Sequence, residues 1–123
     1  MLKVLIADDE KDIRRLIVFT LERAGFEVME ARDGQDVLNK VMEGFTPDIV
    51  LLDVMMPNLD GYEVCRRLRK IESTMTTPIL FLSAKGQNYE MAEGLNAGGT
   101  DYIVKPFIPR ELAAKVKHMT GQQ

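Results

Sequence analysis

Cysteine is nearly absent from this chain, and tryptophan is absent altogether. Cys65 is the only cysteine among 123 residues, so no disulfide can form within the chain. A reducing compartment is therefore expected, and the fold must depend on noncovalent packing. A single thiol between Val64 and Arg66 is expected to be a small buried hydrophobe.

Long hydrophobic runs and an excess of positive charge are missing too. Every apolar run is far shorter than the ~18 residues of a membrane-spanning helix. The short, mostly apolar run 2–7 leads straight into an acidic segment without a small-residue cleavage site, which argues against a signal peptide. The formal net charge of −3 disfavours a nucleic-acid-binding domain, and the basic stretch 66–70 is expected to be a solvated helix face. These features predict a cytoplasmic protein without a membrane or nucleic-acid partner.

The chain does contain a strict alternation of two patterns. Short apolar runs predict five strands, at residues 4–7, 27–30, 49–52, 79–82 and 102–104. The first, third and fourth runs are apolar almost throughout, as expected of strands buried on both faces of a parallel sheet. The second run is more polar and indicates an edge strand.

Apolar residues at helical spacing follow each of these runs. They predict five helices, around residues 13–24, 37–42, 64–71, 89–95 and 112–119. Gly25 and Gly44 are placed to end the first two helices. The third helix is expected to begin near Asp60 and Gly61 and to end before Pro78.

Alternation of strands and helices predicts an α/β fold with a doubly wound parallel sheet. Right-handed crossovers place helices on both faces of such a sheet. At this length the expected strand order is 2-1-3-4-5, the flavodoxin-like arrangement. Residues 1–123 are expected to form one domain, with 120–123 as a frayed end. Whether an effector domain follows residue 123 is left open.

Polar residues stand where four of the five predicted strands end. They are Asp8 and Asp9 after the first strand, Asp53 after the third, Ser83 after the fourth and Lys105 at the end of the fifth. The second strand supplies no such residue. In open α/β sheets ligands bind at the carboxyl ends of the strands, where the strand order reverses. The predicted order therefore brings three carboxylates together at the reversal between the first and third strands.

Three carboxylates and one ammonium leave a formal charge of about −2 in one pocket. Two like charges ~4 Å apart repel by about 4 kcal/mol at an effective dielectric of ~20, so one acid keeps its proton or a divalent cation binds. Oxygen ligands with vacant positions suit Mg²⁺. The cation and Lys105 would stabilise a phosphoryl group on Asp53, and Ser83 could donate a hydrogen bond to it.

Taken one at a time, these residues have simpler explanations. Asp8 and Asp9 could be acids that favour the start of a helix, and Asp53 could cap a turn. Ser83 could be a loop hydroxyl and Lys105 a solvated surface charge. Their common position at strand ends is what indicates a functional site.

Five separated segments closely resemble bacterial response-regulator receiver domains, which act in two-component signalling. These segments are residues 4–10, 48–57, 60–61, 83–84 and 101–107, and the resemblance covers essentially the whole chain. It implies that Asp53 is the phosphoacceptor and that Lys105 pairs with the phosphoryl group. It also implies that Asp8 and Asp9 hold Mg²⁺ together with Asp53 and the backbone carbonyl of Met55.

The same resemblance implies how the signal enters and leaves. The donor is expected to be a histidine kinase or a phosphotransfer protein, and the chain to be a signalling domain rather than an enzyme. Ser83 and Tyr102 are expected to form a switch pair that changes the surface of the fourth helix, fifth strand and fifth helix. The expected output is an effector domain, a target protein or a phosphorylation-dependent homodimer. The Lys105-Pro106 peptide bond is expected to be cis.

Some positions bear on partner binding. By the resemblance, a kinase helix is expected to dock on the first helix, with Ile13, Arg14, Ile17 and Leu21 as candidates. The segment 98–100 reads Gly-Gly-Thr where Gly-Ala-Asp is frequent, which predicts a more mobile loop. The charges that dimerising relatives carry are only partly present, so the mode of dimerisation stays open.

Three other functions fit the sequence less well. A phosphatase of the haloacid-dehalogenase type needs a second Asp two residues after the nucleophile, where this chain has Met55. A flavodoxin-like electron carrier needs a phosphate-binding loop after the first strand, which is missing. A degenerate receiver that binds a partner without phosphorylation would lack site residues, yet all of them are present.

Overall fold

The computed structural model describes residues 1–84 and 97–122. All five predicted strands are present, and four of the predicted helices. The elements are β1 (Lys3–Ala7), α1 (Lys11–Arg23), β2 (Glu27–Ala31), α2 (Gly34–Met42), β3 (Ile49–Asp53), α3 (Gly61–Leu68), the short 3-10 helix η1 (Glu72–Thr74), β4 (Ile79–Ala84), β5 (Asp101–Lys105) and α5 (Pro109–Met119). The helix predicted at 89–95 lies outside the described residues.

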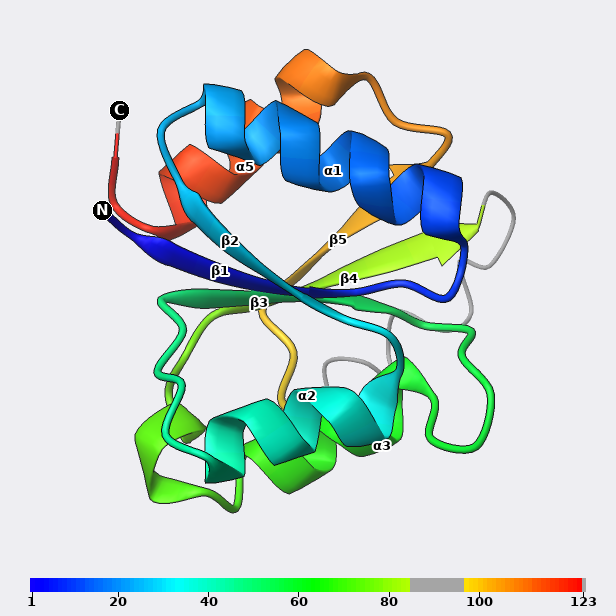
Figure 1. Cartoon of the computed structure of the whole chain (residues 1–123), viewed down its shortest axis with the longest axis vertical. Helices are drawn as coiled ribbons and strands as arrows, with labels where there is room; N and C mark the ends of the chain where they lie inside the picture. The colour runs from blue at the N-terminus through cyan, green and yellow to red at the C-terminus, as the bar shows by residue number, and fades with distance from the viewer. Residues whose placement is uncertain (85–96, 123) are drawn as a thin grey trace.

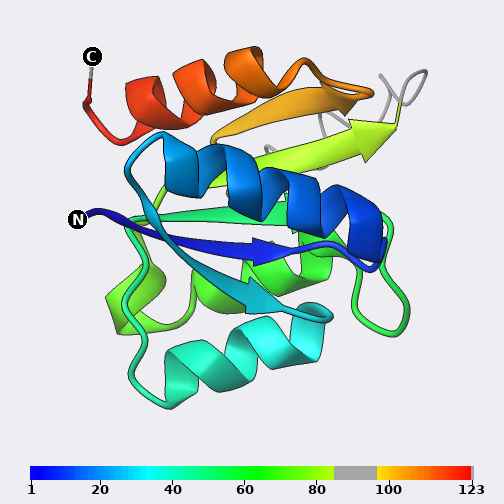
Figure 2. The same cartoon turned by 45° about the horizontal axis from the view of Figure 1, so that its top comes forward.

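The five strands form one parallel sheet in the order β2-β1-β3-β4-β5. Helices α1 and α5 cover one face of this sheet, and α2 and α3 cover the other (Figures 1 and 2). The predicted fold class and strand order are therefore confirmed. Because all strands run in the same direction, their carboxyl ends lie along one edge, at the right of Figure 1.

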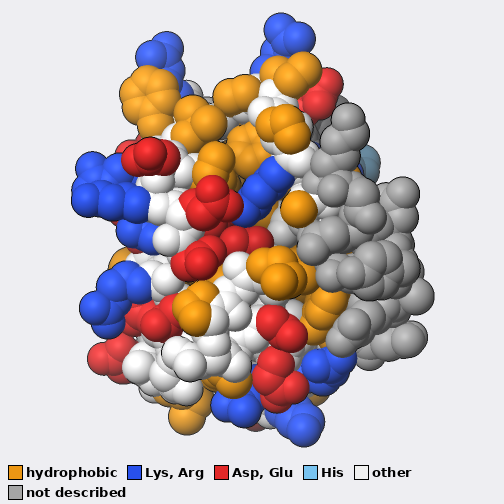
Figure 3. Space-filling model, turned by 90° about the vertical axis from the view of Figure 1, so that its right-hand side faces the viewer, with side chains coloured by type: hydrophobic (Ala, Val, Ile, Leu, Met, Phe, Trp, Pro, Cys, Tyr) orange, Lys and Arg blue, Asp and Glu red, His pale blue; other side chains and the backbone are white. Residues whose placement is uncertain are grey.

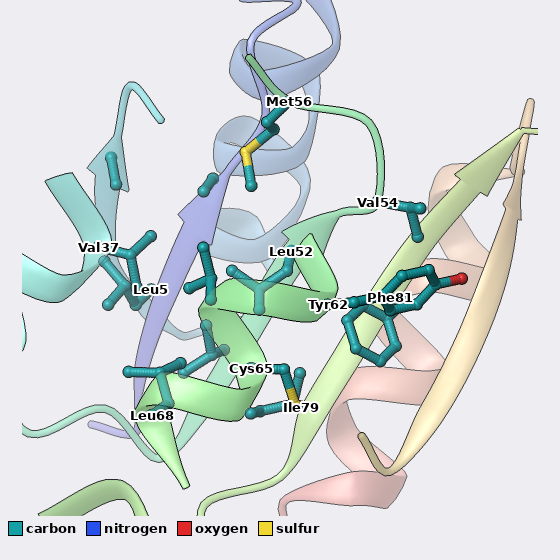
Figure 4. Packing of buried hydrophobic residues seen from close by; sticks show 14 of the residues in the cluster. Leu5, Val37, Leu52, Val54, Met56, Tyr62, Cys65, Leu68, Ile79 and Phe81 are labelled. Atoms are coloured by element: carbon teal, nitrogen blue, oxygen red, sulfur yellow. The ribbon is translucent and has the colours of Figure 1, made fainter. Parts of the chain in front are cut away.

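Each face of the sheet has its own hydrophobic core. The side chains of Ile17 and Leu21 on α1 are fully buried against the first face, together with residues of α5. Figure 4 shows the core of the second face, where Cys65 lies among the aliphatic side chains beneath α3. The Cys65 thiol donates to the Ala97 carbonyl at 3.3 Å, and burial raises its pKa. Cys65 is thus the buried hydrophobe that the sequence predicts.

Burial also revises the expected docking residues on α1. Ile17 and Leu21 have no exposed surface, so these two candidates cannot contact a partner. They lie on the stripe of α1 that packs on the sheet, which is the stripe that helical spacing of apolar residues marks. The apolar side chains that α1 exposes are instead Leu16 and Phe19.

The helix ends follow local signals in the sequence. The side chains of Asp33 and Asp60 accept hydrogen bonds from backbone N–H groups in the first turns of α2 and α3, which offsets unpaired donors there. Gly25 and Gly44 follow α1 and α2 with positive φ angles of 98° and 107°, a conformation that favours glycine. Both glycines therefore end helices, as predicted.

Helix α3 is shorter than its apolar spacing predicts. It ends at Leu68 because the Thr74 hydroxyl donates to the Leu68 carbonyl at 2.7 Å and turns the chain into η1. Arg69 supports this turn by donating to the carbonyls of Thr74 and Thr77 at 2.9 and 2.7 Å. Its Nε donates to the Gly98 carbonyl at 2.8 Å, so Arg69 is a structural clamp and not part of a solvated basic face.

The glycines before β5 are packed closely against the sheet. A Cβ atom on Gly99 would overlap the ring of Phe81, so glycine is needed there for close approach. The sequence predicted a mobile loop, and the structure gives this glycine a packing role. Among the described residues, no helix is long and apolar enough to cross a bilayer.

Candidate acidic site at the carboxyl ends of the strands

The ends of β1, β3 and β5 bring acidic side chains around one lysine. Lys105 Nζ lies 2.8 Å from Asp8 Oδ2, 3.3 Å from Asp53 Oδ2 and 3.5 Å from Glu10 Oε1. Figure 3 looks onto this end of the molecule, where acidic side chains gather beside a basic one near the middle of the face. The predicted convergence at the reversal of strand order is therefore observed for Asp8, Asp53 and Lys105.

Asp53 is the last residue of β3, a strand whose residues are all buried. Its carboxylate is only 7% exposed, and its Oδ1 accepts a hydrogen bond from the Met55 N–H at 3.2 Å. Burial, together with the nearby Asp8 charge, raises the Asp53 pKa to about 7, although Lys105 acts in the opposite direction. Without a cation, Asp53 therefore holds a proton for much of the time at neutral pH.

Asp8 is fully buried at the end of β1. Its Oδ1 accepts a hydrogen bond from the Glu10 N–H at 2.9 Å. Its Oδ2 forms an ion pair with Lys105 Nζ at 2.8 Å. Within the described part of the chain, Asp8 Oδ2 accepts no hydrogen bond. A buried carboxylate oxygen in this state has room for a further positive partner.

The oxygen atoms present fit a hard divalent cation. One carboxylate oxygen each from Asp8, Glu10 and Asp53 lie within 4.8 Å of one another. Mg²⁺ binds oxygen ligands, usually through one or two carboxylates, and keeps several water molecules. The buried Asp8 oxygen that accepts no hydrogen bond from the described residues and the raised pKa of Asp53 both indicate too little positive charge for this set of acids.

Lys105 ends β5, and the peptide bond that joins it to Pro106 is cis, as predicted. Burial alone would lower the pKa of Lys105, but its contacts with Asp8 and Asp53 raise the pKa above its ordinary value. The side chain is 14% exposed and stays charged. An ammonium group is thus held next to the carboxylate of Asp53.

Two metal-binding predictions concern atoms outside this cluster. Asp9 is exposed and is not among the acids that the structure brings together, so its role stays a prediction. The same holds for the Met55 carbonyl. Glu10 lies in the cluster, although it was not among the predicted metal ligands. The acidic run 8–10 was the only signal that could have found it.

The loop after Asp53 is held by a close backbone contact. The Gly61 N–H donates to the Val54 carbonyl at 3.0 Å. A Cβ atom on Gly61 would lie 2.5 Å from the carbonyl oxygen of Asp53, which no real side chain permits. The loop also contains Asn58 in the left-handed region, with a φ of 69°. Gly61 therefore lets α3 begin directly against Asp53.

Ser83 and Tyr102, the predicted switch pair, are both buried. Ser83 lies on β4, one residue beyond Leu82, the neighbour of Asp53 in the sheet. The Tyr102 ring packs on Phe81, with 5.2 Å between ring centroids, and its hydroxyl donates to the Tyr62 hydroxyl at 3.0 Å. The Tyr102 ring is thus turned inward in this structure, and its role as a switch stays a prediction. Its partner Tyr62 on α3 was not predicted.

The sequence is similar to known proteins over nearly its whole length. The sequence model of the response regulator receiver domain matches residues 4–117. The chain is 46% identical over 115 residues to the alkaline phosphatase synthesis transcriptional regulatory protein PhoP of Bacillus subtilis, covering 94% of this chain and 47% of that protein. It is 46% identical over 114 residues to the phosphate regulon transcriptional regulatory protein PhoB of Pseudomonas aeruginosa, covering 93% and 49%. The chain thus spans about half the length of these curated relatives.

Solved structures give the same result. The chemotaxis protein CheY4 of Vibrio cholerae superposes with a TM-score of 0.92 at 35% identity, covering 97% of this chain and 98% of that one. A response regulator structure from Chloroflexus aurantiacus superposes with a TM-score of 0.91 at 37% identity, covering 98% of both chains.

Proposed function

We propose that this chain, which belongs to the response regulator receiver domain family of two-component signalling, is a switch phosphorylated on Asp53. The main support for the proposal is the environment of the Asp53 carboxylate. It is buried at a strand end, 3.3 Å from the Lys105 ammonium and next to two further acids. An acid with no functional role would destabilise the folded protein at this position, because burial and the neighbouring like charge both raise its pKa.

The proposed reaction is transfer of a phosphoryl group from a phosphohistidine of a histidine kinase or a phosphotransfer protein. An Asp53 carboxylate oxygen forms a bond to phosphorus while the bond from phosphorus to the imidazole nitrogen breaks, and that nitrogen keeps the electron pair. The Lys105 ammonium stabilises negative charge on the phosphoryl oxygens, and the Ser83 hydroxyl donates to one of them.

We propose that phosphorylation also depends on Mg²⁺ bound by these residues. When bound, the cation neutralises the acids and the incoming phosphoryl oxygens. We propose that Asp8 and Asp53 hold it, with Asp9 and the Met55 carbonyl as the resemblance implies. Glu10 joins them because its carboxylate lies in the same cluster. A bound cation would favour the ionised form of Asp53, which is the form that attacks phosphorus.

The output is proposed to pass through Ser83 and Tyr102. A phosphoryl oxygen on Asp53 draws the Ser83 hydroxyl toward it and favours the inward position of the Tyr102 ring on β5. In that position the ring contacts Phe81, and its hydroxyl reaches Tyr62 on α3. The bias needed is modest, because about 1–3 kcal/mol changes a population 5- to 150-fold. The exposed surface of β5 and α5, with the helix predicted at 89–95, would change accordingly.

The proposal extends to the domain organisation, the compartment and the output of the protein. Residues 1–123 are taken as one receiver domain in the cytoplasm. The output is an effector domain, a target protein or a homodimer that forms on phosphorylation. The relatives named as transcriptional regulators are about twice as long as this chain, since it covers 47% and 49% of them, which is compatible with an effector domain.

Incubation with acetyl phosphate and Mg²⁺ tests the proposal. The intact mass should rise by one phosphoryl group in the wild type and in Asp12→Asn, an exposed acid on α1 that serves as the matched control. Asp53→Asn should show no gain. Equal gain in Asp53→Asn and the wild type would reject Asp53 as the acceptor.

A further inference from the structure

Arg14 links the acidic site to the edge strand of the sheet. It lies in the first turns of α1, and its side chain is only 15% exposed. Its Nη1 donates to the Asp8 carbonyl oxygen at 2.8 Å, and its Nε donates to Glu30 Oε1 on β2 at 3.0 Å. The guanidinium is therefore engaged by the fold on two sides, and the docking role expected for Arg14 stays a prediction.

Arg14 contacts the turn formed by residues 8–10, and this turn sets the direction of the Asp8 carboxylate. The Glu10 N–H donates to Asp8 Oδ1 at 2.9 Å, so the direction of the Asp8 carboxylate depends on the path of residues 8–10. The Arg14 N–H donates to the Glu10 carbonyl at 2.9 Å. Main chain and side chain of Arg14 thus fasten both ends of the turn. No side chain caps the start of α1, which leaves these contacts to fix it.

We infer that Arg14, oriented by Glu30, is a positioning residue that fixes the Asp8 carboxylate for the cation and for Lys105. The inference rests on the proposed function, since it concerns the same pocket. It also gives β2 a part in the site, although the sequence offered no residue at the end of that strand. Glu30 acts through Arg14 and lies at the level of Ile6, one residue before Ala7 in β1.

The chemistry of the guanidinium suits this role. A planar group donates in two fixed directions at once, here to a carbonyl and to a carboxylate, and a lysine ammonium cannot reproduce that geometry. Hydrogen bonds with a charged donor are shorter and stronger than neutral ones. Groups that orient metal ligands typically change metal affinity by about 10- to 100-fold when they are removed.

Arg14→Met, Arg14→Lys and Glu30→Gln test the inference in the full chain. The matched control is Arg67→Met, because Arg67 Nε pairs with Glu63 Oε2 at the same 3.0 Å on the exposed face of α3. One readout is hydrogen exchange of the Glu10 amide by NMR without metal, which reports the bond to Asp8. The other is Mg²⁺ affinity from an NMR titration of the same samples.

Arg14→Met should weaken Mg²⁺ binding by about 10-fold and speed Glu10 amide exchange by a similar factor. Arg14→Lys should restore little of either, and Glu30→Gln should move both in the same direction by less. Arg67→Met should stay within about 2-fold of wild type, because an exposed ion pair contributes little. If Arg14→Met folds poorly, Glu30→Gln decides the question, since the Glu30 side chain is 45% exposed.

An Arg14→Met variant that loses stability but keeps wild-type Mg²⁺ affinity and Glu10 exchange would overturn the inference, because its role would then be structural only. The proposed function fails separately, if the wild type takes up no phosphoryl group. In that case the Glu10 amide comparison still decides whether Arg14 positions Asp8.

Discussion

Replacing Asp53 by asparagine should stabilise the metal-free protein at neutral and alkaline pH. The Asp53 pKa is raised from 3.8 to about 7 by burial and by Asp8. The folded protein therefore holds a proton on Asp53 over a pH range in which the unfolded chain has released it. The contribution of Asp53 to the free energy of unfolding is fully present below about pH 4, and it is lost as the pH rises through about 7. Asparagine has a similar shape and stays neutral throughout.

The size of the effect follows from the shift. One unit of pKa corresponds to about 1.4 kcal/mol, so the full shift sets an upper limit of about 4 kcal/mol. The variant also loses the attraction between Asp53 and Lys105, although Lys105 keeps Asp8 as a partner at 2.8 Å. We expect Asp53→Asn to gain about 1–3 kcal/mol at pH 8 and close to nothing at pH 4.

Urea unfolding in EDTA at pH 4, 6 and 8 measures this difference. Acids remote from this pocket titrate equally in both proteins, so the difference between variant and wild type reports on Asp53 and its coupling to Asp8 and Lys105. Asp12→Asn, which changes an exposed acid, should differ little from wild type at any pH. A variant less stable than wild type at pH 8, or one whose advantage grows on acidification, would refute the reasoning.

Three further changes have defined outcomes. Tyr62→Phe removes the acceptor of the Tyr102 hydroxyl and should cost about 1 kcal/mol while moving that ring outward, as fluorotyrosine NMR can show. Gly61→Ala forces a Cβ to 2.5 Å from the Asp53 carbonyl oxygen and should lower stability by more than about 2 kcal/mol and slow phosphoryl uptake. Lys105→Met removes the charge that lowers the Asp53 pKa, so a carboxyl NMR titration should place that pKa above about 7.

The sequence predicted the fold well because its signals are local. Strands buried on both faces read as apolar runs, and glycines mark the ends of α1 and α2. The length of α3 could not be predicted in the same way. Its apolar spacing continues to Ile71, but the bond from Thr74 to the Leu68 carbonyl ends the helix, and no periodic pattern shows such a bond.

Part of the site could be predicted for the same reason. Asp8, Asp53 and Lys105 end strands, and parallel strands end at one edge. Which of two adjacent acids points inward is decided by the turn after the strand, and here Asp8 is buried while Asp9 is exposed. The ion pair between Arg14 and Glu30 joins a helix to an edge strand. No sequence pattern predicts it, because both residues look like ordinary surface charges.

The central claim is that Asp53 carries the phosphoryl group, and chemical trapping tests it most directly. Borohydride reduces an aspartyl phosphate to homoserine, so a phosphorylated sample treated in this way retains a record of the modified residue. Peptide mass mapping should find homoserine at position 53 alone, and only when acetyl phosphate and Mg²⁺ were both present. Homoserine at position 8 or 9, or a phosphoryl group that survives on a serine, would contradict the account.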